Sequence, residues 1–209
     1  MEVSPAPGGT RPRQHTGSSD AEVTILHATE ALLAEVPVAK LSVAQIIERA
    51  GVSRATFYFY FGSKYAVITA LLKSVMDEMY QQIQPFVEPG PDMTDQDAIR
   101  ASLEGGARVW AEHRYVLRAT SEHWVDVPEL RELWTGMLHR FTDAVALGID
   151  RGREAGEMPP GADGRSLAAT LLWGTERAFH VAGLGLDDDL PDEDAVAETL
   201  IAIWLGALY

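Results

Sequence analysis

A short aromatic stretch, Arg54 to Phe61, holds the side chains with the clearest chemical potential. At about 100° per residue on a helix, Phe57 and Phe61 share one side. The opposite side collects a methyl group, a hydroxyl and two aromatic rings, from Ala55, Thr56, Phe59 and Tyr60. Such groups suit contact with thymine methyl groups and hydrogen bonds to bases or phosphates in a DNA major groove. Lys64, which follows, can add its charge to a helix N-terminus that faces phosphate.

Three sequence signals predict the elements that position this stretch. Ser42-Val43-Ala44-Gln45 has the S-x-x-Q form of a capping box and predicts a short helix that ends at Ala50. Gly51 supplies the left-handed conformation of a tight turn, and Ser53 can cap a second helix. The whole matches a helix-turn-helix over residues 42–61. The alternative is an ordinary hydrophobic helix in an all-helical core, because aromatic residues at helical spacing are usually buried.

The charge distribution permits DNA binding at this one place. The chain carries a net charge of −14, but residues 1–64 have no net charge, so the remainder carries all of it. Between Pro37 and Lys64, four basic residues face one acidic residue. An acidic body would repel DNA everywhere except at this patch.

The rest of the chain has helical periodicity, which predicts an all-α protein of about nine helices. Residues 20–66 are expected to form a three-helix DNA-binding domain, and residues 67–209 a ligand-binding and dimerisation domain. Residues 1–19 are rich in Pro, Gly, Ser and Thr, which predicts a disordered tail and not a targeting segment. No apolar run approaches the roughly 18 residues of a spanning helix, so we expect a cytoplasmic protein without membrane contact.

The segments Leu41–Ile47 and Ala50–Lys64 closely resemble the signature of the tetracycline-repressor (TetR) family. The Gly-Val-Ser turn, the Thr-Phe-Tyr-x-Tyr-Phe run and the downstream lysine carry the likeness. The FYFYF form looks most like the ethionamide-repressor (EthR-like) branch. The resemblance implies a transcriptional repressor that acts as an Ω-shaped homodimer, with an N-terminal three-helix DNA-binding domain and a variable helical ligand-binding domain.

Carried over by position, the resemblance implies a set of residues that approach double-stranded operator DNA: Ser42, Ser53, Arg54, Ala55, Thr56, Tyr58, Phe59, Tyr60 and Lys64. Ala44 departs from the pattern, because some relatives carry a base-reading arginine there. The operator sequence therefore cannot be transferred.

The C-terminal part is rich in tryptophan, with Trp110, Trp124, Trp134, Trp173 and Trp204 spread over its helices. Taken alone, such aromatic stripes are more often packed core than a binding site. The resemblance implies a mostly apolar tunnel for a small hydrophobic effector, lined by Trp110, Trp134, Leu138, Phe141, Val145, Leu172, Thr175 and Trp204. Thr175 stands where the EthR-like branch often has an amide side chain, so the resemblance does not identify the effector.

The last two helices are expected to form the homodimer interface, with contacts from Leu167, Leu171, Gly174, Ala178, Val196, Leu200, Ile203, Leu205 and Leu208. A two-fold protein would match a palindromic operator.

Enzymatic and cofactor-dependent functions find no support in the motifs. The sequence has no cysteine, no HExxH motif, no Gly-rich phosphate loop and no nucleophile elbow. Glu176 and His180 could form half a metal site, but a partly buried polar pair is the more common arrangement for two such residues. We therefore expect no catalytic residue, no cofactor and no bound metal. A helical adaptor that binds protein instead of DNA stays open as an alternative.

Overall fold

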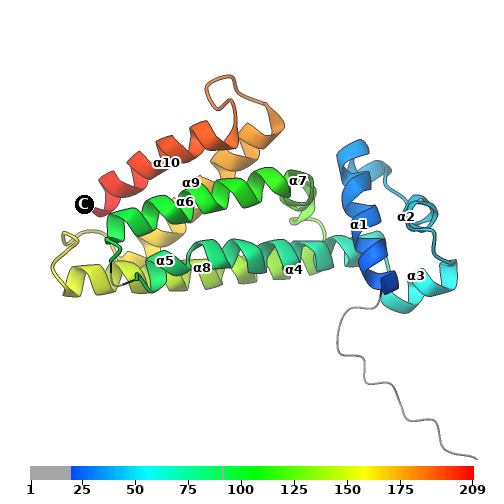
Figure 1. Ribbon diagram of the computed structural model, residues 1–209, viewed down its shortest axis with the longest axis horizontal. Helices are drawn as coiled ribbons and strands as arrows, with labels where there is room; N and C mark the ends of the chain where they lie inside the picture. Colours follow the sequence, from blue (N-terminus) through cyan, green and yellow to red (C-terminus); the bar gives the residue numbers. More distant parts are fainter. Residues whose placement is uncertain (1–19, 91) are drawn as a thin grey trace, which may run out of the picture.

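The computed structural model describes residues 20–90 and 92–209, and all regular structure in this part of the chain is helical (Figure 1). The tail predicted at residues 1–19 lies outside the described residues. The N-terminal elements are α1 (Asp20–Glu35), the 3-10 turn η1 (Val38–Lys40), α2 (Val43–Ala50) and α3 (Arg54–Tyr60). The remaining helices are α4 (Lys64–Gln82), α5 (Gln84–Val87), α6 (Asp95–Glu112), α7 (Arg114–His123), α8 (Pro128–Glu154), α9 (Gly164–Leu184) and α10 (Glu193–Leu208).

The first three helices form a small unit at one end of the molecule (Figure 1). Helix α1 packs against both α2 and α3. Ile25 and Leu33 of α1, Ile46 of α2 and Phe57 of α3 are almost completely buried. These four apolar side chains therefore fix the helix-turn-helix on α1.

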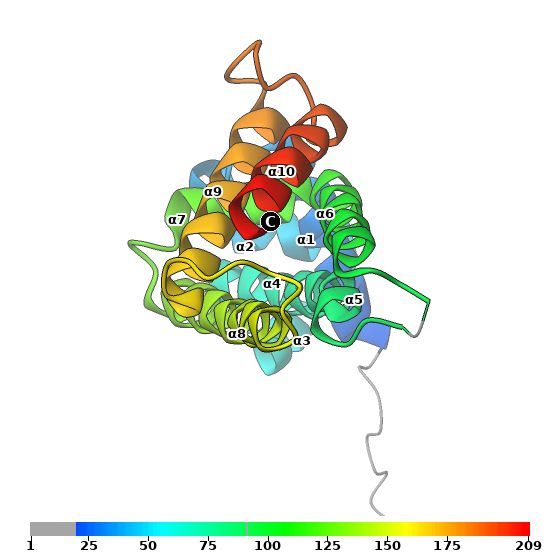
Figure 2. The ribbon, with the colours of Figure 1, turned by 90° about the vertical axis from the view of Figure 1, so that its left-hand side faces the viewer.

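Helix α4 connects this unit to the other helices. It packs against α1 at one end and against α6, α7 and α8 along its length. Figure 2 shows α10 between α9 and α6, with α9 reaching from α8 toward α10. Helix α10 packs on α6 and α9, and α9 packs on α8. Buried side chains of both parts belong to one continuous hydrophobic core, so the boundary predicted at residue 66 falls inside the first turn of α4 and not in a linker.

The nine predicted helices are all present, and the described residues add a tenth, the four-residue α5. From the sequence, Pro85 predicts the end of the helix before it. In the structure it occupies the first turn of α5, where proline is tolerated because a first-turn N–H has no partner within the helix. Phe86, which follows it, is 2% exposed and anchors α5 against the core.

The dimer contacts of Leu171, Val196, Leu200 and Leu208 stay a prediction. These side chains are only 2–9% exposed in a single chain, so they offer little surface to a partner subunit. In α10 the apolar face that was assigned to the dimer packs on α6 and α9 of the same chain. Ile203, by contrast, is 51% exposed, and Gly174 is exposed as well.

None of the described helices is long and apolar enough to cross a membrane.

Candidate DNA-facing helix and apolar cavity

The turn between α2 and α3 is held by the residues that the sequence indicated. Ser42 caps α2, and its backbone N–H donates to Gln45 Oε1 at 2.8 Å, so both halves of the capping box are present. Gly51 ends α2 with a φ of +64°, in the left-handed region. Ser53 caps α3, and its Oγ accepts a hydrogen bond from the Thr56 N–H at 3.0 Å. The predicted conformation of Gly51 is thereby confirmed.

Helix α3 has two faces of opposite character. Phe57 is 0% exposed and Phe61 6%, so these rings are anchors. Phe59 is 79% exposed and Tyr58 46%, and Tyr60 lies between the two faces, partly packed against the core. A largely uncovered phenylalanine beside an exposed tyrosine is unusual without a partner. The alternative of an ordinary core helix therefore fails for this face of α3.

The small and polar residues of the predicted DNA-contacting set lie around the same face. Ser42, Ser53, Arg54 and Ala55 are exposed, and Thr56 is partly exposed. The Ser53 and Thr56 hydroxyls are 2.8 Å apart, and the Arg54 guanidinium lies over the Tyr58 ring, 5.3 Å from its centroid. The structure thus gathers these residues on one surface.

Lys64 is placed differently from the other members of the set. Its Nζ donates to the carbonyl oxygens of Val38 at 2.6 Å and Leu41 at 2.8 Å. Partial burial lowers the pKa of the Lys64 ammonium from its ordinary value. These two bonds use two of its three N–H donors and tie the start of α4 to the turn η1. A role in holding the fold is therefore present whether or not Lys64 also contacts DNA.

The basic patch is smaller than the sequence count suggested. Arg49 makes a bidentate ion pair with Glu35, with N–O distances of 2.8 and 2.7 Å. The hydrogen bond from Arg49 lowers the pKa of the Glu35 carboxyl. Lys40 and Arg54 are exposed. They therefore carry the positive charge near α3 that is more accessible than that of Arg49 and Lys64.

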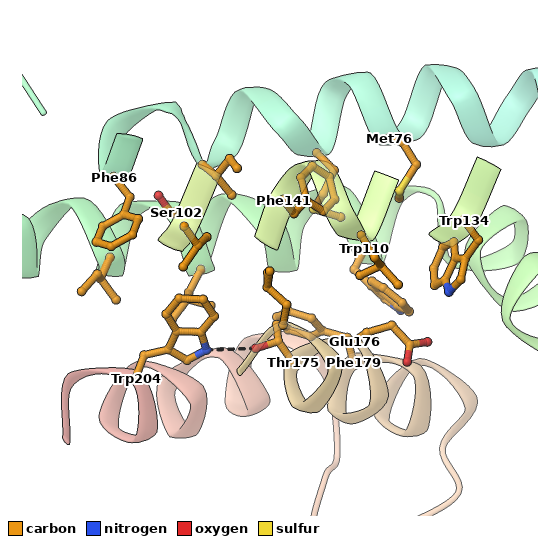
Figure 3. A pocket seen from close by; sticks show the side chains of 17 residues that line it. Met76, Phe86, Ser102, Trp110, Trp134, Phe141, Thr175, Glu176, Phe179 and Trp204 are labelled. Atoms are coloured by element: carbon orange, nitrogen blue, oxygen red, sulfur yellow. Dashed lines mark hydrogen bonds between the residues drawn. The ribbon is translucent and has the colours of Figure 1, made fainter. Parts of the chain in front are cut away.

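An apolar cavity lies among the C-terminal helices (Figure 3). Its volume, counted as the space that the centre of a water molecule can occupy, is about 100 Å³. About 10–15 Å³ of such space is enough for one water, so the cavity could hold a small organic molecule. All eight residues predicted from the resemblance line it. They come from α6, α8, α9 and α10, far apart in the sequence.

Nine further residues line the cavity and were not predicted as ligand contacts: Met76, Met79, Ile83, Phe86, Ile99, Ser102, Leu103, Glu176 and Phe179. Most belong to α4, α5 and α6, where the sequence has no cluster of tryptophans that would indicate a binding site. Trp173, in contrast, is 38% exposed, and its ring lies 6.0 Å from that of Trp124.

A few polar atoms interrupt the apolar wall. Trp204 Nε1 donates to Thr175 Oγ1 at 3.0 Å, as Figure 3 shows. Trp134 Nε1, Ser102 Oγ and Glu176 Oε2 are buried without a hydrogen-bond partner. Buried polar atoms are normally paired, so these three stand out. They are the atoms through which a bound molecule could be oriented.

Glu176 is the ionisable group of the cavity and is 6% exposed. Burial raises the pKa of its carboxyl, against the hydrogen bond that Ser121 Oγ donates to Oε1 at 2.8 Å. Ser121, and not His180, is thus its hydrogen-bond partner. His180 is also buried, and desolvation lowers the pKa of its imidazole.

Comparison with known families agrees with this geometry. Residues 25–71 match the family described as bacterial regulatory proteins, tetR family. Residues 99–209 match the family described as transcriptional regulator EthR, C-terminal domain. The chain belongs to the TetR family. Within it, the C-terminal domain is of the EthR type, as the aromatic run predicted.

Relatives with curated names extend the same likeness over nearly the whole chain. The transcriptional regulator EthR of Mycobacterium tuberculosis is 32% identical over 203 residues, which span 97% of this chain and 93% of EthR. EthR of Mycolicibacterium smegmatis is 33% identical over 205 residues, or 97% of this chain and 92% of that one.

Solved structures share the fold at lower identity. SmeT, the repressor of a multidrug efflux pump of Stenotrophomonas maltophilia, is 22% identical with a TM-score of 0.73, over 90% of this chain and 89% of SmeT. FadR of Bacillus subtilis, solved with stearoyl-CoA, is 18% identical with a TM-score of 0.74, over 90% of this chain and 99% of FadR. These likenesses show the fold.

Membership in this family confirms three predictions. The chain is an all-α transcriptional regulator of the TetR family, it has the N-terminal helix-turn-helix domain of that family, and it is not an enzyme. The contacts of individual residues with DNA or with an effector stay predictions.

Proposed function

We propose that the chain is a homodimeric repressor that binds a palindromic operator through α3 and is released by a small apolar effector in the cavity. The observation that carries the DNA-binding half is the exposed face of α3, where Phe59 is 79% uncovered. Its rings, the Thr56 hydroxyl and the nearby Arg54 offer apolar contact, hydrogen bonds and charge to a major groove. The acidic remainder of the chain would keep DNA at this face.

Two-fold assembly is proposed through the outward faces of α9 and α10. Ile203 and Trp173 are exposed at 51% and 38%, and the small residues Gly174 and Gly206 leave room for close helix approach. An interface of this kind would pair α9 and α10 with the same helices of a second copy. Two recognition helices would then face two half-sites one DNA turn apart, about 34–36 Å.

The effector proposal rests on the apolar cavity. Two of the solved relatives hold apolar or amphipathic molecules: FadR with stearoyl-CoA, and SmeT in a complex with triclosan. An effector would weaken operator binding only by the difference between its affinities for the DNA-binding and the released conformations. The buried polar atoms of Trp134, Ser102 and Glu176 favour an apolar molecule that carries a hydrogen-bonding group.

The first experiment selects operators from random double-stranded DNA with the purified chain. We expect an inverted repeat to be enriched. Footprinting on it should show one protected half-site for each subunit. The variant Phe59→Ala should enrich nothing above background, whereas Glu132→Ala, at an exposed position of α8, should behave like the wild type. Enrichment by neither wild type nor control would favour the adaptor alternative.

The second experiment screens apolar small molecules for quenching of tryptophan fluorescence and for a raised melting temperature. Because three tryptophans line the cavity, a bound molecule should change their emission. It should also stabilise the folded chain by an amount that rises with the logarithm of its concentration over its Kd. An effector that passes both tests should release the selected operator. If no compound in a broad hydrophobic library stabilises the chain, the cavity is only a packing defect.

A further inference from the structure

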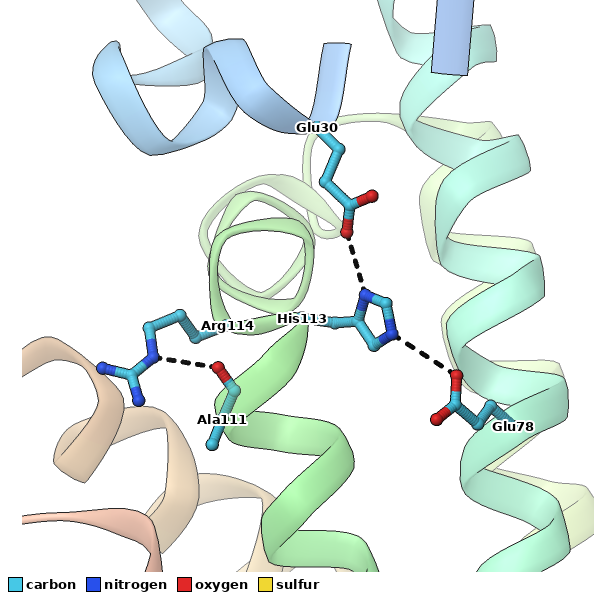
Figure 4. Close-up of polar contacts among 5 residues, drawn as sticks. All are labelled: Glu30, Glu78, Ala111, His113 and Arg114. Carbon is cyan, nitrogen blue, oxygen red and sulfur yellow. Dashed lines mark hydrogen bonds and ion pairs between the residues drawn. The ribbon is translucent and has the colours of Figure 1, made fainter. Parts of the chain in front are cut away.

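A second constellation of chemical interest lies away from the cavity, at the junction of α1, α4, α6 and α7. His113 ends α6, and its ring lies between Glu30 of α1 and Glu78 of α4 (Figure 4). His113 Nδ1 is 2.9 Å from Glu30 Oε1, and Nε2 is 3.4 Å from Glu78 Oε2. One imidazole therefore faces a carboxylate on each side.

A neutral imidazole cannot satisfy both contacts. It carries one N–H, and its other nitrogen presents a lone pair. The shorter contact, to Glu30, has the length of a hydrogen bond and places the proton on Nδ1. Nε2 then directs its lone pair toward Glu78, an arrangement of two electron donors that a bound cation would stabilise.

The adjacent Glu112 adds a third donor near the ring. One carboxylate oxygen of Glu78, one of Glu112 and one nitrogen of His113 all lie within 4.8 Å of one another. Two donors of a tetrahedral zinc site, each about 2.0–2.2 Å from the metal, are about 3.4 Å apart. The distance of 3.4 Å between His113 Nε2 and Glu78 Oε2 equals that separation.

The neighbouring arginine does not supply the missing positive charge. Arg114 points away from the cluster, where its Nε donates to the Ala111 carbonyl at 3.1 Å (Figure 4). Its terminal nitrogen is 3.1 Å from Glu193 Oε2, on α10. Three carboxylates thus lie around one imidazole, while the guanidinium of the adjacent Arg114 pairs with Glu193.

We propose that Glu78, Glu112 and His113 bind a divalent transition-metal ion, with Glu30 as the positioning residue that orients the imidazole. A histidine ligand commonly donates its other N–H to a carboxylate, which fixes its tautomer and raises its basicity as a ligand. Mixed imidazole and carboxylate donors suit Zn²⁺ and its neighbours among the first-row metals. Glu78 and Glu112 are exposed, so an ion can enter from solvent.

The test uses full-length, tag-free protein stripped with a chelator and titrated calorimetrically with Zn²⁺ alone. We expect one ion per chain and a rise in melting temperature on zinc addition. His113→Gln and Glu78→Gln should each weaken zinc binding at least ten-fold. Two matched controls, His139→Gln on α8 and Glu104→Gln on α6, change exposed residues and should leave the affinity unchanged.

Glu30→Gln tests the positioning role separately. It should weaken zinc binding about 10–100-fold, as is usual when the carboxylate behind a histidine ligand is lost, but should keep the same ligands. X-ray absorption at the zinc edge, or the visible spectrum of the Co²⁺ form, should then show one imidazole and oxygen donors in both proteins. This measurement on the wild type also decides the question if a variant fails to fold.

Two outcomes would overturn the proposal. One is a wild-type chain that binds no zinc, which would leave His113 with its two carboxylate contacts alone. The other is zinc binding that His113→Gln and Glu78→Gln do not alter, which would place the ion elsewhere. Neither outcome depends on operator or effector binding.

Discussion

At the scale of single residues, the aromatic run of α3 divides into anchors and exposed rings. Phe57 and Phe61 are buried, and their rings lie 6.2 Å apart, whereas Phe59 projects outward. The periodicity of the sequence predicted this division, because side chains four residues apart share a helix face. The sequence could not predict that Lys64 would bind two backbone carbonyls, since that contact depends on how η1 meets α4.

Replacement of the two phenylalanines should therefore separate folding from DNA binding. Phe57→Ala should lower the free energy of unfolding by about 3–5 kcal/mol, as for other buried aromatic residues. Phe59→Ala should leave the free energy of unfolding nearly unchanged but weaken operator binding at least ten-fold. Chemical denaturation and gel-shift titration measure the two effects. Equal destabilisation by both changes would contradict the assignment of faces.

Lys64→Ala distinguishes a structural contact from a phosphate contact. Loss of the ammonium leaves the carbonyls of Val38 and Leu41 without this donor, which should cost about 1–3 kcal/mol of folding free energy. If Lys64 also neutralises a phosphate, the slope of log affinity against log salt should fall by about 1. We expect the stability loss. An unchanged salt slope would remove Lys64 from the predicted DNA contacts.

Glu176 should make stability depend on pH. Its pKa is raised in the folded chain because burial disfavours the charged carboxylate, so the folded chain holds its proton to higher pH than the unfolded chain. Stability is then greatest below the unfolded pKa and falls as pH rises through the folded pKa. Glu176→Gln removes this loss.

Stability measurements from pH 4 to pH 8 check this sign. The stability of Glu176→Gln relative to the wild type should increase with pH. Glu132→Gln, at an exposed position of α8, should show no such trend. A difference that is constant with pH would mean that Glu176 is not titrating in the folded chain.

At the scale of helices, the sequence predicted most elements because capping signals are local. Ser42, Ser53 and Ser63 cap α2, α3 and α4, and each is recognisable from neighbours in the sequence. Helix α5 was missed because proline usually marks the end of a helix, whereas Pro85 lies in the first turn of a new one. The donors around His113 were missed because Glu30 and His113 are 83 positions apart, a distance that only the packing of α1 on α7 closes.

Two glycines near α3 offer a matched test of the turn. A Cβ at Gly51 or at Gly62 would meet no atom within 4 Å, but only Gly51 of the two has a positive φ. Gly51→Ala should therefore cost about 1–2 kcal/mol through backbone strain alone. Gly62→Ala should cost little. Thermal unfolding of both variants is the measurement, and a Gly51→Ala chain as stable as wild type would contradict the strain argument.

At the scale of the whole molecule, the cavity depends on helices that no single motif connects. The resemblance indicated the eight lining residues on α6, α8, α9 and α10, but the contributions of α4 and α5 required the structure. Composition and periodicity alone favoured packed core over a binding site. The sequence could not decide between the two, because whether aromatic side chains fill a space or surround one depends on the relative placement of six helices.

Filling the cavity should uncouple the effector from the operator. Leu138→Trp replaces an aliphatic side chain in the cavity wall with a bulky indole ring. It should abolish effector-dependent changes in melting temperature, while operator binding persists. Leu147→Trp adds the same ring at a position of α8 that is 63% exposed and should keep the effector response. An effector that still stabilises Leu138→Trp would have to bind outside the cavity.

Helix α4 joins the cavity mechanically to the N-terminal helices. Lys64, in its first turn, is fastened to the turn before α2, and Met76, twelve residues later, lines the cavity. At 1.5 Å per residue these two points are about 18 Å apart on one rigid rod. A tilt of about 10° at the Met76 end would move the Lys64 end by about 3 Å. Lys64 binds the carbonyls of Val38 and Leu41, which lie directly before the helix-turn-helix. In the proposed homodimer, α4 can therefore act as a lever that converts a small change in cavity width into a change in the spacing of the two α3 helices.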